Sequence, residues 1–149
     1  MSLPIYCCVI LHCAADDTIL LEHRPPTCSV APSRLTCFGG KREPHEAPHV
    51  CALRELMEEL SWVPPALTPG LDLLVDGVLT AHFFTAPAPP LDAPLVYEAG
   101  REGVRLPLQA ALLDPRISPW HACVLEAWQR GLTRAHFRES SGSPPPGAV

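Results

Sequence analysis

The sequence predicts a mixed α/β domain, in which buried strands alternate loosely with two helices. Short apolar stretches rich in β-branched residues are typical of strands, and they recur along the chain. Two longer segments, near residues 50 and 125, have helical periodicity instead. The chain has 149 residues, of which 47% are hydrophobic and 18% charged. This size and composition predict one domain with one core, over residues 1–137.

The N-terminal part predicts a β-hairpin followed by a third strand. Residues 5–12 and 18–23 are two apolar runs separated by an Ala-Ala-Asp-Asp turn. A short strand over 35–38 follows. We expect it to stop at Gly39 and Gly40, because residues without a β-carbon let the chain turn sharply.

The segment 46–60 is predicted to be a helix that Pro64-Pro65 closes. Its apolar residues recur at spacings of three and four, so they share one stripe that we expect to face the core: Val50, Leu53, Met57 and Leu60.

Two further strands are predicted over 71–75 and 78–85, on either side of an Asp-Gly turn. The proline-rich stretch 86–94 predicts an irregular surface loop, and 104–108 is a weaker strand candidate.

Near the C-terminus, Ser118-Pro119 offers a helix N-cap followed by proline at the first helical position. A helix over 120–130 is expected, with Val124, Leu125 and Trp128 inward and a glycine after its end. Residues 138–149 contain three consecutive prolines and are expected to form a disordered tail.

Charge and cysteine content exclude several classes of protein. The net charge is −5, which disfavours binding to a long nucleic acid but allows a small phosphorylated ligand. Seven cysteines without a CxxC pair favour reduced, packed thiols over disulfides or a zinc ribbon. The N-terminal apolar run is too short for a membrane span and lacks the features of a signal peptide. We therefore expect a cytoplasmic protein without a membrane partner.

Three carboxylates gather on the predicted helix 46–60. Glu55, Glu58 and Glu59 fall in one sector opposite the apolar stripe, with Arg54 at its edge. Each like-charged pair at such spacing costs a helix roughly 0.2–0.5 kcal/mol. A hard divalent cation such as Mg²⁺ would turn this repulsion into binding, since it prefers carboxylates together with phosphate oxygens.

The spacing of these residues resembles the Nudix box, the signature of the Nudix hydrolase superfamily. Six glycine or charged positions match over 23 residues from Gly40 to Trp62: Gly40, Glu46, Arg54, Glu55, Glu58 and Glu59. Ser61 stands where the family has a glycine near the end of the box. The resemblance implies a Nudix-type α/β/α sandwich with a mixed β-sheet. It also implies Mg²⁺-dependent, or alternatively Mn²⁺-dependent, hydrolysis of the pyrophosphate bond in a nucleoside diphosphate linked to another group.

The resemblance also implies roles for individual residues. Glu55, Glu58 and Glu59 would hold the metal together with the carbonyl of Gly39, and Gly40 and Glu46 would be structural. Arg54 would orient the catalytic carboxylates, and Glu55 is our choice of general base. Family members sometimes take the base or a further ligand from a later loop, where Glu98 and Glu102 are candidates and Glu102 is preferred.

Substrate contacts are expected from two residues outside the box. Arg24, directly after the second predicted strand, is a candidate for a phosphate contact. Tyr97, beside the proline-rich loop, is a candidate for stacking on a base, whereas core packing is expected for most of Phe83, Phe84 and Trp120. Nucleotide sugars, ADP-ribose, dinucleoside polyphosphates, coenzyme A derivatives and oxidised nucleoside triphosphates all remain open as substrates.

Two alternative functions compete with the hydrolase. One is a non-catalytic Nudix-like domain that senses a nucleotide, which the complete set of box carboxylates disfavours. The other is a zinc metalloprotease, because residues 45–49 (HEAPH) fit the H-E-x-x-H pattern. That chemistry needs both histidines on one helix, and Pro44 and Pro48 disfavour it. A homodimer is left open.

Overall fold

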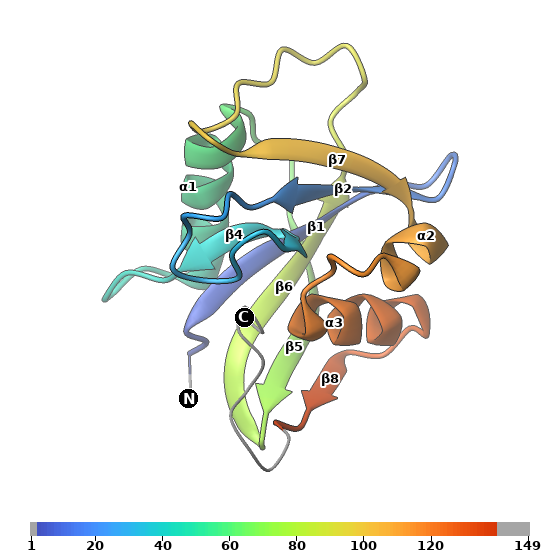
Figure 1. Cartoon of the computed structure of the whole chain (residues 1–149). Helices are drawn as coiled ribbons and strands as arrows, with labels where there is room; N and C mark the ends of the chain where they lie inside the picture. The colour runs from blue at the N-terminus through green and yellow to red at the C-terminus, as the bar shows by residue number, and fades with distance from the viewer. Residues whose placement is uncertain (1–2, 140–149) are drawn as a thin grey trace.

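A computed structural model describes residues 3–139 of the chain. Its elements, shown in Figure 1, follow in chain order: β1 (Tyr6–Cys13), β2 (Thr18–His23), β3 (Leu35–Thr36), β4 (Phe38–Lys41), α1 (Pro48–Leu60), β5 (Thr68–Val75), β6 (Val78–Pro87), β7 (Glu102–Pro107), α2 (Leu108–Leu113), α3 (Pro119–Gln129) and β8 (Arg134–Phe137).

The strands of the described residues form one mixed sheet. Its main path runs β3-β2-β1-β6-β5-β8, while β4 pairs with β1 and β7 pairs with β2. β1 runs parallel to β6 and β5 parallel to β8, and the other pairs are antiparallel. The predicted hairpin is present, with Leu11 opposite Leu20. The predicted α/β class with a mixed sheet is therefore confirmed.

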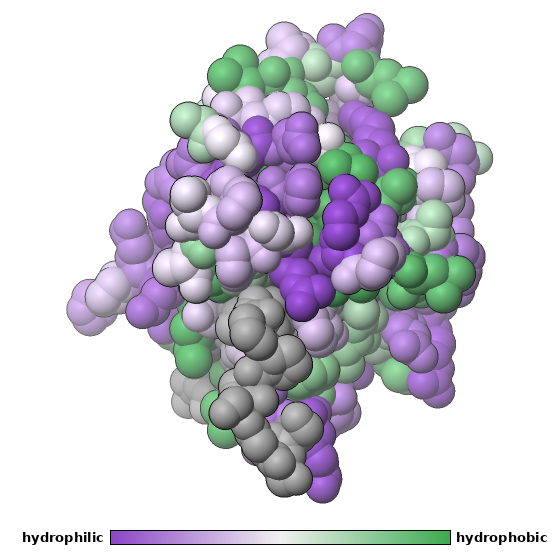
Figure 2. Space-filling view, viewed as in Figure 1, coloured by the Kyte–Doolittle hydropathy of each residue, from purple (hydrophilic) through white to green (hydrophobic). Residues whose placement is uncertain are grey.

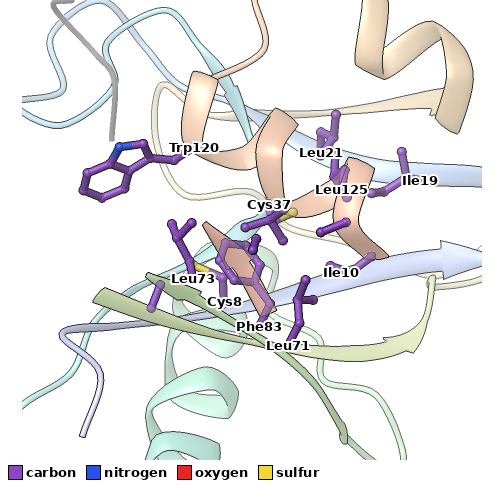
Figure 3. Packing of buried hydrophobic residues seen from close by; sticks show 14 of the residues in the cluster. Cys8, Ile10, Ile19, Leu21, Cys37, Leu71, Leu73, Phe83, Trp120 and Leu125 are labelled. Atoms are coloured by element: carbon purple, nitrogen blue, oxygen red, sulfur yellow. The ribbon is translucent and has the colours of Figure 1, made fainter. Parts of the chain in front are cut away.

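Helices cover both faces of the sheet, and the alternation of side chains along β1 explains how. Cys8 and Ile10 point into a core that also contains Val124 and Leu125 of α3. Their neighbours Cys7, Val9 and Leu11 point the other way, into a second core closed by Leu56 and Leu60 of α1. Figure 3 shows the packing on the α3 side, where Leu125 lies beside Ile10 and Ile19.

The predicted apolar stripe of α1 is wrong except at Leu60, which is buried. Val50 and Met57 are 46% and 51% exposed, and the buried apolar residues are Cys51, Ala52, Leu56 and Leu60. Cys51 and Ala52 are small, so this side of the helix can approach β1 and β4 closely. The helix is thereby rotated so that Glu59 is buried on the sheet side, instead of lying opposite the core.

The expected turn at Gly39 and Gly40 is also wrong, because both glycines lie within strand β4. A β-carbon on Gly39 would lie 2.4 Å from the Cys7 carbonyl oxygen, and one on Gly40 would lie 2.4 Å from Cδ of Glu55. The glycines are needed for close approach of neighbouring groups, and the chain does not turn there.

Several boundaries differ from the sequence-based expectation. The strand expected over 35–38 is split at Cys37 into β3 and β4, and α1 begins at Pro48 and not at residue 46. α2 and β8 are short elements that no pattern predicted. The strands β5 and β6 and the helix α3 with its inward Val124 and Leu125 are confirmed. Of the expected tail, residues 140–149 lie outside the described residues.

No helix within residues 3–139 is long and apolar enough to cross a membrane. All seven cysteines are free.

Candidate active site

A cavity of about 480 Å³ lies where α1, β4 and the N-terminus of α3 meet. One part of its wall is acidic and comes from α1 and the loop before β7: Glu55, Glu58, Glu59 and Glu98. Basic side chains face them: Arg24, Lys41 and Arg101. A size of several hundred Å³ is typical of small-molecule sites. Figure 2 shows that side chains over the middle of this face, around β4 and residues 24–34, are mostly polar.

Arg54 organises the carboxylates at the edge of the cavity. Its guanidinium donates two hydrogen bonds to Glu46, at 2.7 and 3.0 Å, so the pair is bidentate. Its Nη1 also donates to Glu55 at 3.1 Å and to Glu58 at 3.2 Å. Hydrogen bonds from Arg54 and from the backbone of Glu43 lower the pKa of Glu46 to about 2. Glu46 is thus a fixed anion that anchors Arg54, which in turn holds two of the cavity's carboxylates.

Glu59 is the most buried carboxylate of the cavity, with 3% of its surface exposed. Its Oε1 accepts a hydrogen bond from the backbone N–H of Gly39 at 3.0 Å. Burial, followed by the nearby Glu22, raises the pKa of Glu59 well above its usual value. A carboxylate in this position gains from any cation that enters the cavity.

Glu22 of β2 lies behind the cavity and is completely buried. Arg101 Nη1 lies 3.0 Å from its Oε1, but this ionic contact lacks the geometry of a hydrogen bond. Arg24 Nε is 3.7 Å from the same oxygen. Because Arg101 also contacts Glu59 at 3.7 Å and Glu98 at 2.7 Å, it joins three carboxylates at the back of the site.

Glu55 packs against Gly40 of β4 and is held by Arg54. Burial is the main reason why the pKa of Glu55 is raised. A carboxylate with a raised pKa is a stronger base, which is the property that general-base catalysis at neutral pH requires.

The loop before β7 is fastened to the end of α1. Glu98 N–H donates to the Glu59 carbonyl at 3.1 Å, and Val96 N–H donates to the Leu60 carbonyl at 3.0 Å. These bonds satisfy carbonyl groups that a helix end leaves without a partner. Ser61 ends α1 in the left-handed conformation, with φ 53° and ψ 35°, so it adopts the conformation usually given to glycine at this point. Glu98 is therefore positioned beside the box carboxylates.

Two residues predicted for the site lie elsewhere. Glu102 begins β7, is largely exposed and contacts His23 at 3.2 Å, and it does not line the cavity. Tyr97 packs against the core on the α1 side and approaches Gly103, also outside the cavity. The structure brings together Arg24, Gly39, Gly40 and the three box glutamates, but neither of these two residues.

The side chains present suit a hard cation, although they do not form a complete cage. Carboxylates that line one cavity, one of them buried beside another carboxylate, provide the oxygen ligands and the uncompensated charge that Mg²⁺ favours. Within residues 3–139, no three His, Cys, Asp or Glu side chains converge as a ready metal site. Mg²⁺ commonly takes only one or two carboxylates from a protein and completes its coordination with water and substrate phosphate oxygens.

The H-E-x-x-H segment does not have the geometry of a zinc site. His45 has a φ of 67° and lies before α1, whereas His49 lies within the helix. The two histidines therefore do not share the continuous helix that zinc-protease chemistry needs.

Sequence analysis missed Glu22, Arg101 and His121. Glu22 carried a usable signal, because a charged residue inside a strand whose neighbours are apolar on both faces is unusual unless it is paired or functional. Arg101 and His121 carried no such signal. Their positions depend on which loop and which helix end meet the cavity.

Comparison with known proteins gives the family. The family model described as the NUDIX domain matches residues 4–128. The solved structure of a MutT protein from Methanosarcina mazei Go1 is 20% identical, covers 88% of this chain and 97% of its own, and has a TM-score of 0.67. The E. coli dihydroneopterin triphosphate pyrophosphohydrolase is 18% identical, with coverages of 87% and 97% and a TM-score of 0.65.

The E. coli ORF135 protein is 26% identical over 84% of this chain and 87% of its own, with a TM-score of 0.58. A search of curated proteins found no match. The family model covers most of the chain, the solved structures share its fold, and Glu55, Glu58 and Glu59 of the box line one cavity. The chain belongs to the Nudix hydrolase family.

Proposed function

We propose that this protein is a Mg²⁺-dependent pyrophosphohydrolase that cleaves a nucleoside diphosphate linked to another group, by attack of water at phosphorus. The observation that carries the proposal is the shared cavity wall: Glu55, Glu58 and Glu59 come from one helix, and two arginines from other segments face the same space. Membership of the family supports the hydrolase reaction.

The metal would be held by Glu55, Glu58 and Glu59, with the backbone carbonyl of Gly39 as a further ligand. When bound, Mg²⁺ neutralises diphosphate oxygens and lowers the pKa of a bound water. Glu59 Oε1 is fixed by its bond to the Gly39 N–H, and Oε2, which Arg101 contacts at 3.7 Å, is the oxygen that would bind the metal. Mn²⁺ prefers the same oxygen ligands and is the expected substitute.

Glu55 would act as the general base. Its side chain lines the cavity, and burial raises its pKa. A hydrogen bond of 3.1 Å from Arg54 fixes the orientation of the carboxylate. A positioned base of this kind contributes about 10²–10⁴-fold to a rate. Glu98, and not Glu102, is the loop carboxylate that lines the cavity, so it replaces Glu102 as the second candidate.

Arg24 and Arg101 would bind the diphosphate. Both line the cavity, and their contacts with Glu22 hold them in place before the substrate arrives. Arginine suits this role because its planar guanidinium pairs with phosphate oxygens in a defined geometry. The dihydroneopterin triphosphate pyrophosphohydrolase supports a pyrophosphate substrate that carries a heterocycle. Reduced thiols and family membership support a cytoplasmic location.

The test is a phosphate-release screen with Mg²⁺ and Mn²⁺ on nucleotide sugars, ADP-ribose, dinucleoside polyphosphates, coenzyme A derivatives and nucleoside triphosphates. We expect metal-dependent turnover of at least one compound. Glu58→Gln should reduce this turnover about 100-fold or more without loss of stability, because it removes a metal ligand and relieves crowding on α1. Glu126→Gln, on the exposed face of α3, is the matched control. Absence of turnover on every compound would favour a nucleotide sensor.

A further inference from the structure

The cavity has a second half, which contains no carboxylate. It is lined by aromatic and small apolar side chains under the N-terminus of α3: Tyr6, Leu73, Ala81, Phe83, Trp120 and His121. The rings of Tyr6 and Trp120 meet edge to face with centroids 6.5 Å apart. Figure 3 shows Trp120 at the margin of the packed cluster that contains Leu73 and Phe83. A planar group is the kind of ligand that such a wall accommodates.

His121 is the polar residue of this half, and its hydrogen bonding fixes its tautomer. The backbone N–H of Cys37 donates to Nδ1 of His121 at 3.0 Å, so Nδ1 is an acceptor and carries no hydrogen. In a neutral imidazole the hydrogen then lies on Nε2. The ring also lines the cavity, and the donor that it can offer there is Nε2–H.

The surroundings of His121 keep the ring neutral. Burial, together with the positive charge of Arg24, lowers the pKa of His121 to about 3. The ring of Phe83 packs edge to face against it, with centroids 5.3 Å apart. Because the main-chain bond and the packing hold the ring, the direction of its single donor is set by the fold.

We propose that His121 determines substrate specificity: it presents one fixed donor, Nε2–H, in the aromatic half of the cavity and selects a planar heterocycle whose edge carries a carbonyl oxygen. An exocyclic amino group in the same position is also a hydrogen-bond donor, so neither it nor the Nε2–H would have an acceptor. A buried donor without a partner costs free energy, so a site of this type strongly disfavours a heterocycle that carries an amino group in place of the carbonyl. The proposal deepens the proposed function, because it concerns the group attached to the diphosphate.

Inosine and adenosine compounds test this, since they differ in the carbonyl or amino group at one ring carbon. In the wild-type protein, we expect kcat/KM for inosine triphosphate to exceed that for adenosine triphosphate by about 10-fold or more. Equal values, or a preference for the adenosine compound, would overturn the proposal.

Two variants separate the donor from the structural role of the ring. His121→Asn can still accept from the Cys37 N–H but does not extend to the position of Nε2. It should remain folded, because the bond to the main chain is kept, and lose the preference for inosine. His121→Gln reaches the position of Nε2 with an amide donor and should retain part of the preference. An Asn variant that discriminates as well as the wild type would remove His121 from the specificity site.

Binding of the free nucleosides keeps the test independent of catalysis. Inosine and adenosine lack the diphosphate, and their binding to the wild-type protein and the Asn variant can be followed without metal through the Trp120 indole resonance by NMR. Tighter binding of inosine that Asn abolishes would support the proposal even if no diphosphate is hydrolysed. Equal binding of both nucleosides, or no binding of either, would contradict it.

Discussion

Glu59 on α1 and Gly39 on β4 are joined by a hydrogen bond of 3.0 Å from the Gly39 N–H to the carboxylate. The same side chain therefore links the box helix to the sheet and offers an oxygen to the cavity. Burial and the nearby Glu22 raise its pKa, so the fold holds a carboxylate in surroundings that oppose its charge. A bound cation would favour the ionised carboxylate and so offset the cost of burying its charge.

Glu59→Gln should remove activity and increase stability. Its amide oxygen can still accept from Gly39, but the buried charge is gone, and we expect turnover to fall roughly 100-fold or more. A raised folded-state pKa means that ionisation of Glu59 destabilises the fold, and this penalty is absent well below pH 4.5 and grows as pH rises toward the folded pKa. Thermal unfolding at pH 4 and pH 8 should show the larger gain in Tm at pH 8. If the variant's Tm at pH 8 were equal to or lower than that of the wild type, the buried charge of Glu59 would not be the source of the penalty.

The two glycines of β4 should respond differently to alanine. In Gly40→Ala the new methyl group meets the flexible carboxylate of Glu55, which can move away, so we expect kcat to fall 10-fold or more with a modest loss of stability. In Gly39→Ala the methyl group meets the backbone of Cys7 and Cys8, and φ is 149°, so strand pairing itself must shift. The free energy of unfolding of that variant should fall by roughly several kcal/mol. Denaturant unfolding and steady-state kinetics distinguish the two.

Arg54→Lys should lower activity and change the acid stability of the protein. Lysine cannot reproduce the bidentate bond to Glu46 or reach both Glu55 and Glu58, so we expect kcat to fall about 10–100-fold. The pKa of Glu46 is lowered to about 2 by this pairing. Its stabilising contribution is thus present above the unfolded value of 4.5 and is lost as pH falls toward 2.

The difference in unfolding free energy between wild type and Arg54→Lys should accordingly be largest above pH 5 and disappear near pH 2. Arg116→Lys is the matched control, because Arg116 makes a similar two-pronged contact with Asp114 away from the cavity. It should leave kcat unchanged. A loss of activity in this control equal to that of Arg54→Lys would show that the effect is not local.

Glu98→Gln and Glu102→Gln separate two neighbouring carboxylates. Glu98 lines the cavity and contacts Arg101 at 2.7 Å, so its neutralisation should lower kcat/KM about 10-fold or more. Glu102 is exposed at the start of β7 and contacts His23 of β2, so its neutralisation should leave kcat/KM within about twofold of wild type. The reverse order of effects would restore Glu102 as the catalytic loop residue.

The sequence was sufficient for what depends on local spacing. The fixed distances from Gly40 to Glu59 predicted the box and its helix, and they indicated that Arg54 orients carboxylates, as its hydrogen bonds to Glu55 and Glu58 show. The bidentate contact of Arg54 with Glu46 was not predicted. Apolar runs and turn residues likewise predicted the hairpin, β5, β6 and α3. The periodicity of a single strand or helix depends only on residues that are close in sequence.

Only the tertiary structure decided which side of α1 faces the sheet. Val50 and Met57 looked like core residues, yet the small Cys51 and Ala52 allow close packing on another side, and Glu59 is buried as a result. Periodicity ranks the faces of a helix by hydrophobicity, but the surface that the helix must fit is formed by distant strands.

The far wall of the cavity was likewise beyond the sequence alone. Arg101 and His121 lie far apart along the chain, yet both line the cavity, and Glu22 lies behind it in contact with Arg101, because the fold brings β2, the loop before β7 and α3 together. Thus the sequence by itself determined the family, the box and its carboxylates, since these depend on neighbours a few residues apart. The burial, pKa and partners of those carboxylates, and the second half of the cavity, were decided by long-range packing.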